Sequence, residues 1–442
     1  MSQYTEKDLH ILEEPFVEIR KKVKILLRMG CLLSENGANA NQIVRDMRRA
    51  AAYMGIPADH LHIHIAYSNI LINIHSPEDC FTSFRNVQYL GANMDIISSI
   101  SVLTWTALRK EYTLDEFSQK LEEIAKKDPP HSDSTSAIFA GFACGAFPIL
   151  FGGTIISAWI TTFCALLGFI IQLILKRFQI NGYISIACAA AVSSGLAFLS
   201  GCIFDSTDVI YAMIACTLFM VPGIPLINTV DDLLNNYILA GISRAVHTLL
   251  IVGSMTVGIS MAQYFNHSYD FTHLSIVPDS ISIVLLGAAV VGAAGYAVMF
   301  YTPKRLLPLI GIGGLIAILV KNTLILYLGF SVFGATFIAA AMVSLFSLKA
   351  ARYSHTSSKV LAIPSAIPLV PGVFIYRFLY AMLHINSLTS TTLVEAIQSG
   401  VTAILIIISI GVGVAIPSIL AGKVLDARKE KKLESLLDKR YT

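Results

Sequence analysis

The sequence predicts a membrane protein of the all-α class, with about ten transmembrane helices arranged as two five-helix inverted repeats and preceded by a small cytosolic α+β domain. Three observations predict this class: a long block almost without charge, a consistent charge bias between loops, and a motif that occurs twice. Of the 442 residues, 55% are apolar and 14% are charged, whereas soluble domains carry roughly a quarter charged residues. A single soluble globule, a disordered chain and a collagen-like fibre are therefore excluded.

The charged residues are distributed very unevenly. Residues 136–422 hold only 10 Lys or Arg and 7 Asp or Glu, which predicts that this block lies in the membrane. The residues before it have the charge density of an ordinary soluble domain. We therefore divide the chain into a cytosolic domain with its linker, a first and a second membrane repeat, and a basic cytosolic tail: residues 1–135, 136–268, 279–422 and 423–442.

Hydrophobic periodicity predicts mixed secondary structure in the cytosolic domain. Apolar residues at helical spacing predict four helices, and alternation of polar and apolar residues predicts two paired strands. No apolar run opens the chain, so we expect no cleavable signal peptide and a first domain that stays in the cytosol. The predicted helices are 16–33, 39–54, 87–109 and 113–127, the strands are 60–65 and 69–75, and the linker is 128–133.

The rest of the chain divides into ten apolar stretches of membrane-spanning length, because about 20 helical residues cross the hydrocarbon core. Only two glycines separate the first stretch from the second. The ten predicted spans are 136–152, 154–175, 182–204, 208–228, 238–265, 280–301, 306–328, 331–351, 359–383 and 394–421.

Charges in the loops predict the orientation of these spans. The loops after the second and sixth spans, the loop around the eighth and ninth spans and the tail carry Lys or Arg, whereas the loops on the opposite side hold Asp or Glu as their only charged residues. Because basic loops stay on the cytosolic side, both termini are predicted to be cytosolic, in a protein of the cell's inner membrane. The basic groups that decide this are Lys176, Arg177, Lys304, Arg305, Lys349, Arg352 and Lys359.

The motif Val-Pro-Gly occurs in the middle of the fourth span, at Pro222-Gly223, and again in the ninth, at Pro371-Gly372. These spans hold the same place in each block of five, which predicts a duplication. Because five is odd, the second copy must be inverted relative to the first. Inverted repeats with interrupted helices at matching positions are how many secondary transporters build a binding site. A simple proline kink is the alternative for either break.

Charged residues inside the spans are costly and indicate function. Asp231 and Asp232 follow the first break, and Arg244 in the fifth span is placed to pair with either carboxylate. Lys321 lies deep in the seventh span, and Arg377 follows the second break. A carboxylate beside an arginine suits proton coupling, and a basic group near a broken helix suits a substrate carboxylate. The alternative is that these side chains extend toward the membrane surface.

Other candidates are weaker. His60, His62 and His64 share one face of a predicted strand, but their spacing is not that of a structural zinc site, which favours a solvated face or a subunit contact. The seven cysteines form no Cys-x-x-Cys pair. No nucleotide-binding, hydrolase or metalloprotease motif is present, and no basic stripe suits nucleic acid. We therefore expect no cofactor, no metal and no catalytic residue, although a membrane-anchored sensor or enzyme acting through the first domain stays open.

The stretch from Met220 to Leu233, continuing to Arg244, resembles the threonine/serine exporter family. The family pattern is Val-Pro-Gly-x-Pro-Leu, here with Pro225 as its second proline, followed by an Asp that Asp232 matches best and by Gly-x-x-Arg ending at Arg244. Residues 366–372, with Tyr376 after them, resemble the small membrane subunit of the two-component relatives. The resemblance thus implies a fusion of both components.

This resemblance implies export of a small metabolite, driven by the proton motive force. We predict a threonine/serine exporter acting by proton antiport, with a succinate or dicarboxylate exporter as the alternative because Arg377 and Lys321 add cations. Its expected partners are the substrate, protons and the lipid bilayer, and an assembly of identical chains stays open. The predicted substrate contacts are Pro222, Gly223, Pro225, Asn228, Pro371, Gly372, Tyr376 and Arg377, and the predicted coupling groups are Asp231, Asp232, Arg244 and Lys321.

Overall fold

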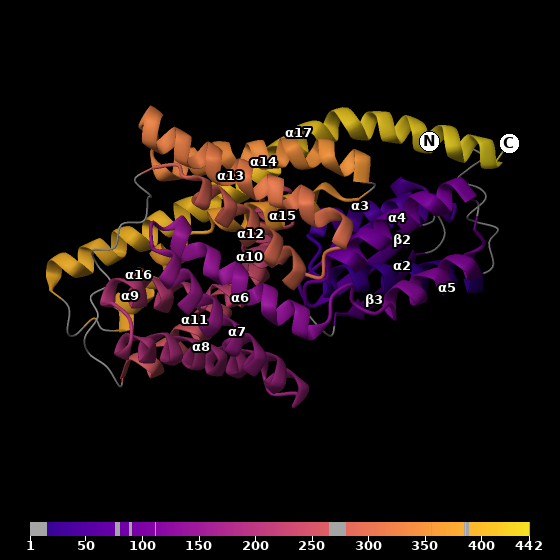
Figure 1. The fold of residues 1–442 in the computed structure, drawn as a ribbon. Helices are drawn as coiled ribbons and strands as arrows, with labels where there is room; N and C mark the ends of the chain where they lie inside the picture. Colours follow the sequence, from indigo (N-terminus) through magenta and orange to yellow (C-terminus); the bar gives the residue numbers. More distant parts are fainter. Residues whose placement is uncertain are drawn as a thin grey trace.

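The structure, a computed structural model, describes residues 16–75, 80–87, 91–110, 112–264, 280–354, 356–383, 385 and 389–441. Two parts are visible in Figure 1: an N-terminal α/β region, which we define as residues 16–125, and a bundle of apolar helices beside it. The helices of the α/β region are α2 (Phe16–Glu35), α3 (Ala40–Tyr53), α4 (Met94–Lys110) and α5 (Leu114–Ala125), with the short 3-10 helix η1 (Ala58–His60).

The α/β region contains a three-stranded antiparallel sheet in the order β1 (Leu61–Ile65), β2 (Asn69–His75), β3 (Cys80–Asn86). The central strand alternates as predicted, with Ile70, Ile72 and Ile74 buried. The third strand was not predicted. In the sequence Cys-Phe-Thr-Ser-Phe-Arg-Asn the two phenylalanines are three residues apart, and every residue is exposed or half-exposed. The backbone bonds to β2 therefore form this edge strand without a buried apolar face.

The predicted helix 87–109 begins too early. Its residues 88–90 lie outside the described part of the chain, residues 91–93 are irregular, and α4 begins at Met94. The Asn93 side chain accepts hydrogen bonds from the amides of Asp95 and Ile96, at 3.0 and 3.2 Å. Asparagine at this position satisfies amides that a helix leaves without partners, so it fixes where the helix starts.

Within the described ranges, seven helices are long and apolar enough to cross a membrane, or nine if each of two bent pairs is one span. A further apolar helix, α12, has 17 residues. The ten-span count therefore stays a prediction. The α-helices that follow the α/β region are α6 (Asp133–Leu150), α7 (Ile155–Arg177), α8 (Gly182–Leu199), α9 (Ser206–Ala215), α10 (Gly223–Leu234), α11 (Ile238–Tyr264), α12 (Ile283–Met299), α13 (Leu307–Leu328), α14 (Val332–Ser354), α15 (Ser358–Ala366), α16 (Gly372–Leu383) and α17 (Ser390–Tyr441).

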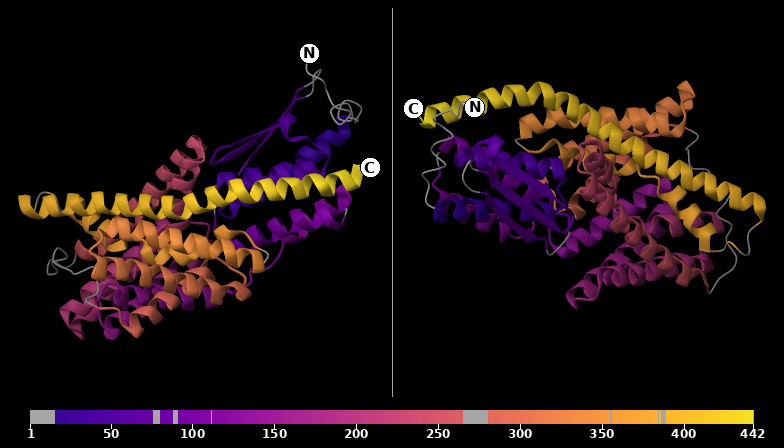
Figure 2. Two further views of the ribbon diagram at one scale, coloured as in Figure 1. Left: turned by 90° about the horizontal axis from the view of Figure 1, so that it is seen from above. Right: turned by 180° about the vertical axis from the view of Figure 1, so that it is seen from behind.

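Helix α17 is much longer than the tenth predicted span. It runs for 52 residues and continues through the predicted basic tail. Figure 2 shows it passing along the bundle and on beside the α/β region. The sequence after Gly422 has no proline or glycine and is rich in Lys, Glu and Leu, so the helix continues where the apolar pattern stops.

The two halves of the bundle pack in the same pattern. In the first half α6 packs on α7 and α8 on α11, and in the second half α12 packs on α13 and α14 on α17. Between the halves, α9 contacts α16 and α10 contacts α15. The beginning of each bent pair thus lies beside the end of the other, so the two pairs run in opposite directions. This arrangement supports an inverted duplication.

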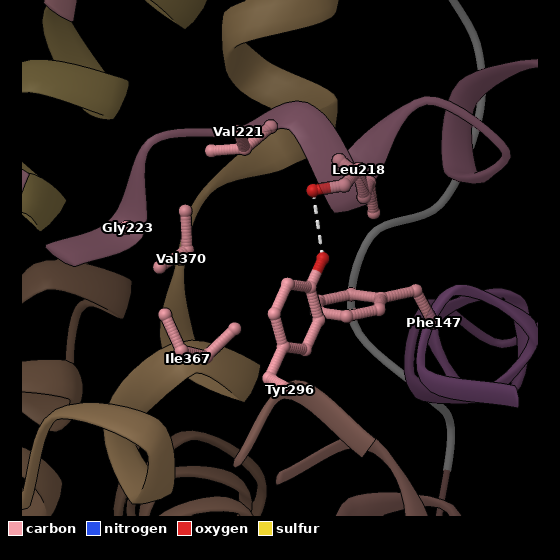
Figure 3. Close-up of a pocket in the computed structure, with 7 residues that line it drawn as sticks. All are labelled: Phe147, Leu218, Val221, Gly223, Tyr296, Ile367 and Val370. Atoms are coloured by element: carbon pink, nitrogen blue, oxygen red, sulfur yellow. Dashed lines mark hydrogen bonds between the residues drawn. The ribbon is translucent and has the colours of Figure 1, made fainter. Parts of the chain in front are cut away.

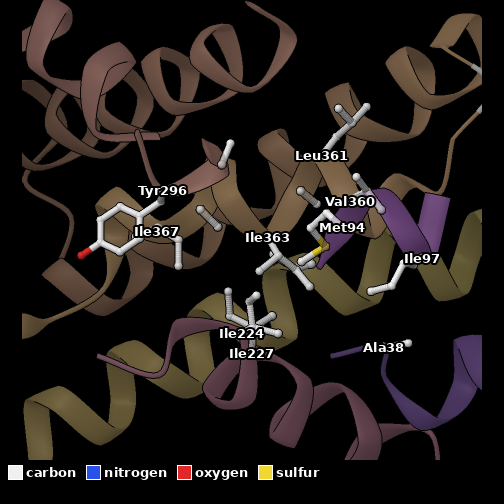
Figure 4. Close-up of a cluster of buried hydrophobic side chains, with 14 of the residues drawn as sticks. Ala38, Met94, Ile97, Ile224, Ile227, Tyr296, Val360, Leu361, Ile363 and Ile367 are labelled. Carbon is white, nitrogen blue, oxygen red and sulfur yellow. The ribbon is translucent and has the colours of Figure 1, made fainter. Parts of the chain in front are cut away.

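The α/β region docks against one end of the bundle. The amides of Met94 and Asp95 donate to the carbonyls of Phe300 and Tyr301, at 2.9 and 3.2 Å. Ser98 bonds Thr356 at 2.8 Å, in the loop before α15. Figure 4 shows Met94 and Ile97 of α4 beside Val360 of α15, within one buried apolar cluster. The loops that carry Lys304, Arg305 and Lys359 therefore share one end of the bundle with this region.

Candidate functional site: two facing helix breaks and a buried charge cluster

The first break lies between the 3-10 helix η3 (Leu218–Met220) and α10, where the chain bends by 60°. Because Pro222 has no N–H, the carbonyl of Leu218 four residues earlier loses its helical donor. That carbonyl instead accepts from the amide of Val221 at 3.0 Å and from the hydroxyl of Tyr296 at 2.7 Å. Pro225 lies in the first turn of α10, where a missing N–H is tolerated.

The second break lies between η5 (Ile367–Leu369) and α16, and bends by 56°. The two breaks touch reciprocally. A β-carbon on Gly223 would overlap the Cδ1 atom of Ile367, and a β-carbon on Gly372 would overlap the Cδ2 atom of Leu218. Ile367 and Leu218 each precede the proline of their own break by four residues. A two-fold axis that relates two inverted repeats would exchange these two contacts.

A small cavity lies beside the contacts between the two breaks. Its volume is about 10 Å³, close to the least space that one water molecule needs. Figure 3 shows Tyr296 and Phe147 on one side of it and the two breaks on the other. An amino acid is several times larger than water, so the structure is closed between the breaks. The residues lining this cavity are Phe147, Leu218, Val221, Gly223, Tyr296, Ile367 and Val370.

The second part of the site is a buried charge cluster at the end of α10. The Nε atom of Arg244 on α11 lies 2.9 Å from Oδ2 of Asp232, and both side chains are buried. The neighbouring Asp231 is also buried and pairs with Lys359 of α15, whose side chain is 13% exposed. Each buried carboxylate thus has its own cation, which low-dielectric surroundings require.

The α/β region completes this cluster with the turn between α2 and α3. The backbone amide of Ala40 donates to Oδ1 of Asp232 at 2.8 Å, and the Asn39 side chain donates to Asp231. The carbonyl of Ala38 accepts from Nη2 of Arg244 at 2.7 Å. The carbonyl of Gly37 accepts from the side chain of Asn228 at 2.9 Å. One turn therefore contacts both members of the Asp232–Arg244 pair.

A second loop of the α/β region covers the same arginine. The guanidinium of Arg244 lies 5.5 Å from the ring centre of Tyr67, in the turn between β1 and β2. Burial raises the pKa of Tyr67 to about 12, so its hydroxyl stays protonated at neutral pH. The ring of His247, one turn further along α11, lies 5.3 Å from Tyr67. Arg244 is thus enclosed between two turns of the α/β region and α10.

The predicted site residues fall into separate groups. Gly223 lines the cavity, and Gly372 packs on Leu218 beside it. Asn228, Asp231, Asp232 and Arg244 gather at the turn between α2 and α3. Tyr376 and Arg377 lie on α16, which begins at the second break, and Lys321 lies on α13.

Sequence reasoning missed several residues of the site. Tyr296 and Phe147 carry no signal of their own, although they occupy similar places in the first helix of each half, four residues before Phe300 and Phe151. Asn39 has a local role as the N-cap of α3, where its side chain accepts from the amide of Gln42 at 3.1 Å. Its second contact, with Asp231, has no local signal. Lys359 was used only as a loop charge.

The three histidines singled out in the sequence, His60, His62 and His64, lie on the sheet of the α/β region and in the turn before it. His62 and His64 are exposed on one face of β1, as the alternation predicted, whereas His60 belongs to the preceding turn η1. In the part of the chain that the structure describes, no group of three His, Cys, Asp or Glu side chains is arranged to hold a metal ion.

Two antiparallel broken helices that meet inside a bundle of apolar helices define a multi-pass membrane protein of the transporter type. Comparison with known sequences identifies the family within this class. A profile of threonine/serine exporters matches residues 24–266, and a second profile of the same exporters matches residues 286–420. The chain belongs to the threonine/serine exporter family. No solved structure matches it.

Individual relatives match either one half of the chain or both. The "Probable succinate transporter subunit YjjP" of Escherichia coli (strain K12) is 26% identical over 55% of this chain and 94% of its own length. The "Probable threonine/serine exporter" of Mycobacterium tuberculosis is 22% identical over 91% of this chain and 77% of its own. The "Threonine/serine exporter" of Corynebacterium glutamicum is 23% identical over 84% and 77%. The predicted fusion of two components is therefore confirmed.

Proposed function

We propose that this chain is a secondary exporter that moves threonine and serine out of the cytosol in exchange for protons. The observation that carries the proposal is the reciprocal contact of the two breaks, Gly223 with Ile367 and Gly372 with Leu218. Two interrupted helices that cross in opposite directions can open toward one side of a membrane while they close toward the other. Membership of the threonine/serine exporter family and the names of the relatives that match both halves supply the substrate class.

In this proposal the substrate passes between the breaks when they separate. The cavity of about 10 Å³ then corresponds to a closed state. Prolines and glycines at 222–223 and 371–372 leave backbone groups without helical partners, and these groups can bind a polar substrate inside the membrane. Pro225 and Asn228 extend this path along α10. Tyr376 and Arg377 extend it along α16, where a cation suits the substrate carboxylate.

Asp232 is the proposed proton-coupling group. As a carboxylate it holds both the side chain of Arg244 and the amide of Ala40. Protonation removes the charge that fixes them, so binding of a proton is linked to release of α11 and of the turn between α2 and α3. Asp231, with Lys359 and Asn39 as partners, is the second carboxylate of the pathway. Lys321 is a further charge that this pathway can use.

The experiment is efflux of labelled threonine from loaded cells, with and without an uncoupler. We expect Asp232→Asn to abolish proton-dependent efflux while the protein still inserts in the membrane. Because this change leaves Arg244 buried without its partner, at a cost of about 3–5 kcal/mol, Asp232→Asn with Arg244→Gln is the second variant. Asp205→Asn, at an exposed position before α9, is the matched control. Normal efflux in Asp232→Asn would exclude Asp232 from the mechanism.

A dicarboxylate is the second candidate substrate. The relative whose name includes succinate matches 55% of the chain at 26% identity. Arg377 and Lys321 add two cations to the helix bundle, and two cations suit a dianionic substrate better than a zwitterionic one. Efflux of labelled succinate, measured beside threonine in the same cells, separates the two substrates.

We further propose that the protein lies in the inner membrane with both termini in the cytosol. The basic loops that predict this orientation share one end of the bundle with the α/β region. Cytosolic substrate would then reach the bundle at the Asp232–Arg244 pair.

A further inference from the structure

The turn between α2 and α3 presents opposite polar groups to the two members of one ion pair. The carbonyl of Ala38, which carries a partial negative charge, lies 2.7 Å from Nη2 of Arg244. The amide of Ala40, which carries a partial positive charge, lies 2.8 Å from Oδ1 of Asp232. The two groups come from residues only two positions apart. An α-amino acid has the same pair of groups on one carbon, a carboxylate and an ammonium.

The Asp232–Arg244 pair is buried, and its polar atoms bond both to each other and to the turn. Both side chains are almost completely buried. Each uses one side for its partner, at 2.9 Å, and offers another to the turn. A group that takes the place of the turn must therefore offer an acceptor to the guanidinium of Arg244 and, at the same time, a donor to the carboxylate of Asp232. The bonds to the turn are charge-assisted on one side only, whereas a ligand ammonium on Asp232 and a ligand carboxylate on Arg244 would add the attraction between two full opposite charges.

We propose that Asp232 and Arg244 form an entry site for a zwitterionic α-amino acid, and that residues 37–40 occupy this site as a built-in competitor. The ammonium of the ligand replaces the amide of Ala40 on Asp232, and its carboxylate replaces the carbonyl of Ala38 on Arg244. This inference rests on the proposed function, because it specifies where the exported amino acid first binds. Asn39 and Asn228 hold the competitor in place through Asp231 and the carbonyl of Gly37.

A substitution at Gly37 can weaken the binding of residues 37–40 to the Asp232–Arg244 pair. Its φ of +91° is a conformation that residues with side chains rarely adopt, and a β-carbon there would lie 3.1 Å from the carbonyl oxygen of Gly91. Gly37→Ala therefore weakens the seating of the turn without changing Asp232 or Arg244. Gly55, at the end of α3, also has a positive φ, of +80°. Gly55→Ala is the matched control, with a similar backbone penalty outside the contacts made by residues 37–40.

The first test is equilibrium binding of labelled L-threonine to the full-length protein in lipid nanodiscs. A weaker competitor raises the fraction of open sites, so we expect Gly37→Ala to bind threonine about fivefold more tightly than wild type and Gly55→Ala to bind it equally. N-acetyl-L-threonine and L-threonine methyl ester, which each lack one charge, should compete at least tenfold more weakly than threonine. Unchanged or weaker threonine binding by folded Gly37→Ala would overturn the proposal.

The second test needs no variant. Hydrogen–deuterium exchange of the peptide containing Ala40 is measured with and without saturating threonine. Bound ligands usually slow exchange, whereas displacement of the turn must speed exchange of the Ala40 amide. If cells export threonine and the protein binds it while this amide stays protected, the inference fails and the proposed function stands. If cells export neither threonine nor serine and the protein binds neither, the proposed function fails and the inference fails with it.

Discussion

Gly223 in the first helix break packs directly against Ile367 in the second, with no room between them for a β-carbon. The inverted counterpart of this contact joins Gly372 to Leu218. The absence of a side chain at two glycines therefore sets how closely the halves of the bundle approach. The cavity where the breaks meet has only about 10 Å³, so these contacts leave no space for an amino acid between the breaks.

We expect Gly223→Ala to impair closure of the breaks and to lower threonine efflux at least threefold. The new methyl group overlaps Cδ1 of Ile367, and overpacking of this kind costs about 1–3 kcal/mol. Ile367→Val removes that atom, so the double variant should recover most of the lost efflux and thermal stability. Both quantities are measured for the two single variants and the double variant, as a double-mutant cycle.

The control for this experiment is Gly253→Ala. Gly253 lies in α11, and a β-carbon there meets no atom within 4 Å. Alanine is also the better helix former. Efflux and stability should therefore be unchanged or slightly raised. If Gly223→Ala behaves like Gly253→Ala, the close approach of the two breaks has no role in transport.

The ion pair between Asp231 and Lys359 yields a second prediction. Lys359→Met leaves the carboxylate of Asp231 buried with only neutral donors, which costs about 2–4 kcal/mol of stability. Removing both charges, in Asp231→Asn with Lys359→Gln, should cost less than Lys359→Met alone. The measurement is thermal unfolding in detergent. Lys349→Met, at an exposed position of α14, is the control and should unfold like wild type.

The parts of this protein that the sequence predicts are those with a local signal. The apolar stretches, both breaks and the pairing of Arg244 with one of the two neighbouring aspartates follow from hydropathy, from proline and glycine, and from the cost of isolated charge in a membrane. The edge strand at Cys80–Asn86 and the continuation of α17 were missed because neither has an apolar pattern.

The contact between residues 37–40 and α10 cannot be predicted from the local sequence. Asn39 and Asp231 are 192 positions apart in the chain. An asparagine before a helix is fully explained by its role as a cap, which this one also performs. Nothing in the local sequence distinguishes a cap that also contacts another part of the fold, so only the packed structure reveals the second role.

The pair between Arg28 and Glu122 makes the α/β region sensitive to acid. Nε of Arg28 lies 2.7 Å from the Glu122 carboxylate, and this hydrogen bond holds the pKa of Glu122 below its usual value of 4.5. Stabilisation by the pair is therefore complete above pH 4.5 and is lost as the pH falls through the lowered pKa. Because the Glu122 side chain is 43% exposed, we expect a contribution below about 1 kcal/mol.

Trp105 in α4 reports on this region, and Trp159 is the other of the two tryptophans in the chain. Urea unfolding of full-length Trp159→Phe, followed by Trp105 fluorescence, should show that Glu122→Gln lowers stability at pH 7 and has a smaller effect at pH 3. Glu123→Gln, one position further along α5, is the control. An equal effect of Glu122→Gln at both pH values would contradict the assignment of the acid sensitivity to this pair.

Two native cysteines test the orientation of the protein in the membrane. Cys80 is exposed on β3 of the α/β region, and Cys202 is exposed in η2 (Ser200–Cys202) after α8, at the end of the third predicted span. These positions are predicted to lie on opposite sides of the membrane. Burial raises the pKa of Cys31 to about 11, so this thiol of the α/β region should not react at neutral pH.

We therefore expect a membrane-impermeant maleimide to label intact cells at Cys202 and to label Cys80 only after permeabilisation. Cys202→Ser should remove the label obtained with intact cells, and Cys80→Ser should remove part of the label gained on permeabilisation. Both variants should keep their efflux activity, because neither residue touches the breaks or the charge cluster. Labelling of Cys80 in intact cells would place the α/β region outside the cell, where cytosolic substrate could not reach Asp232 and Arg244 first, and the proposed direction of export would be wrong.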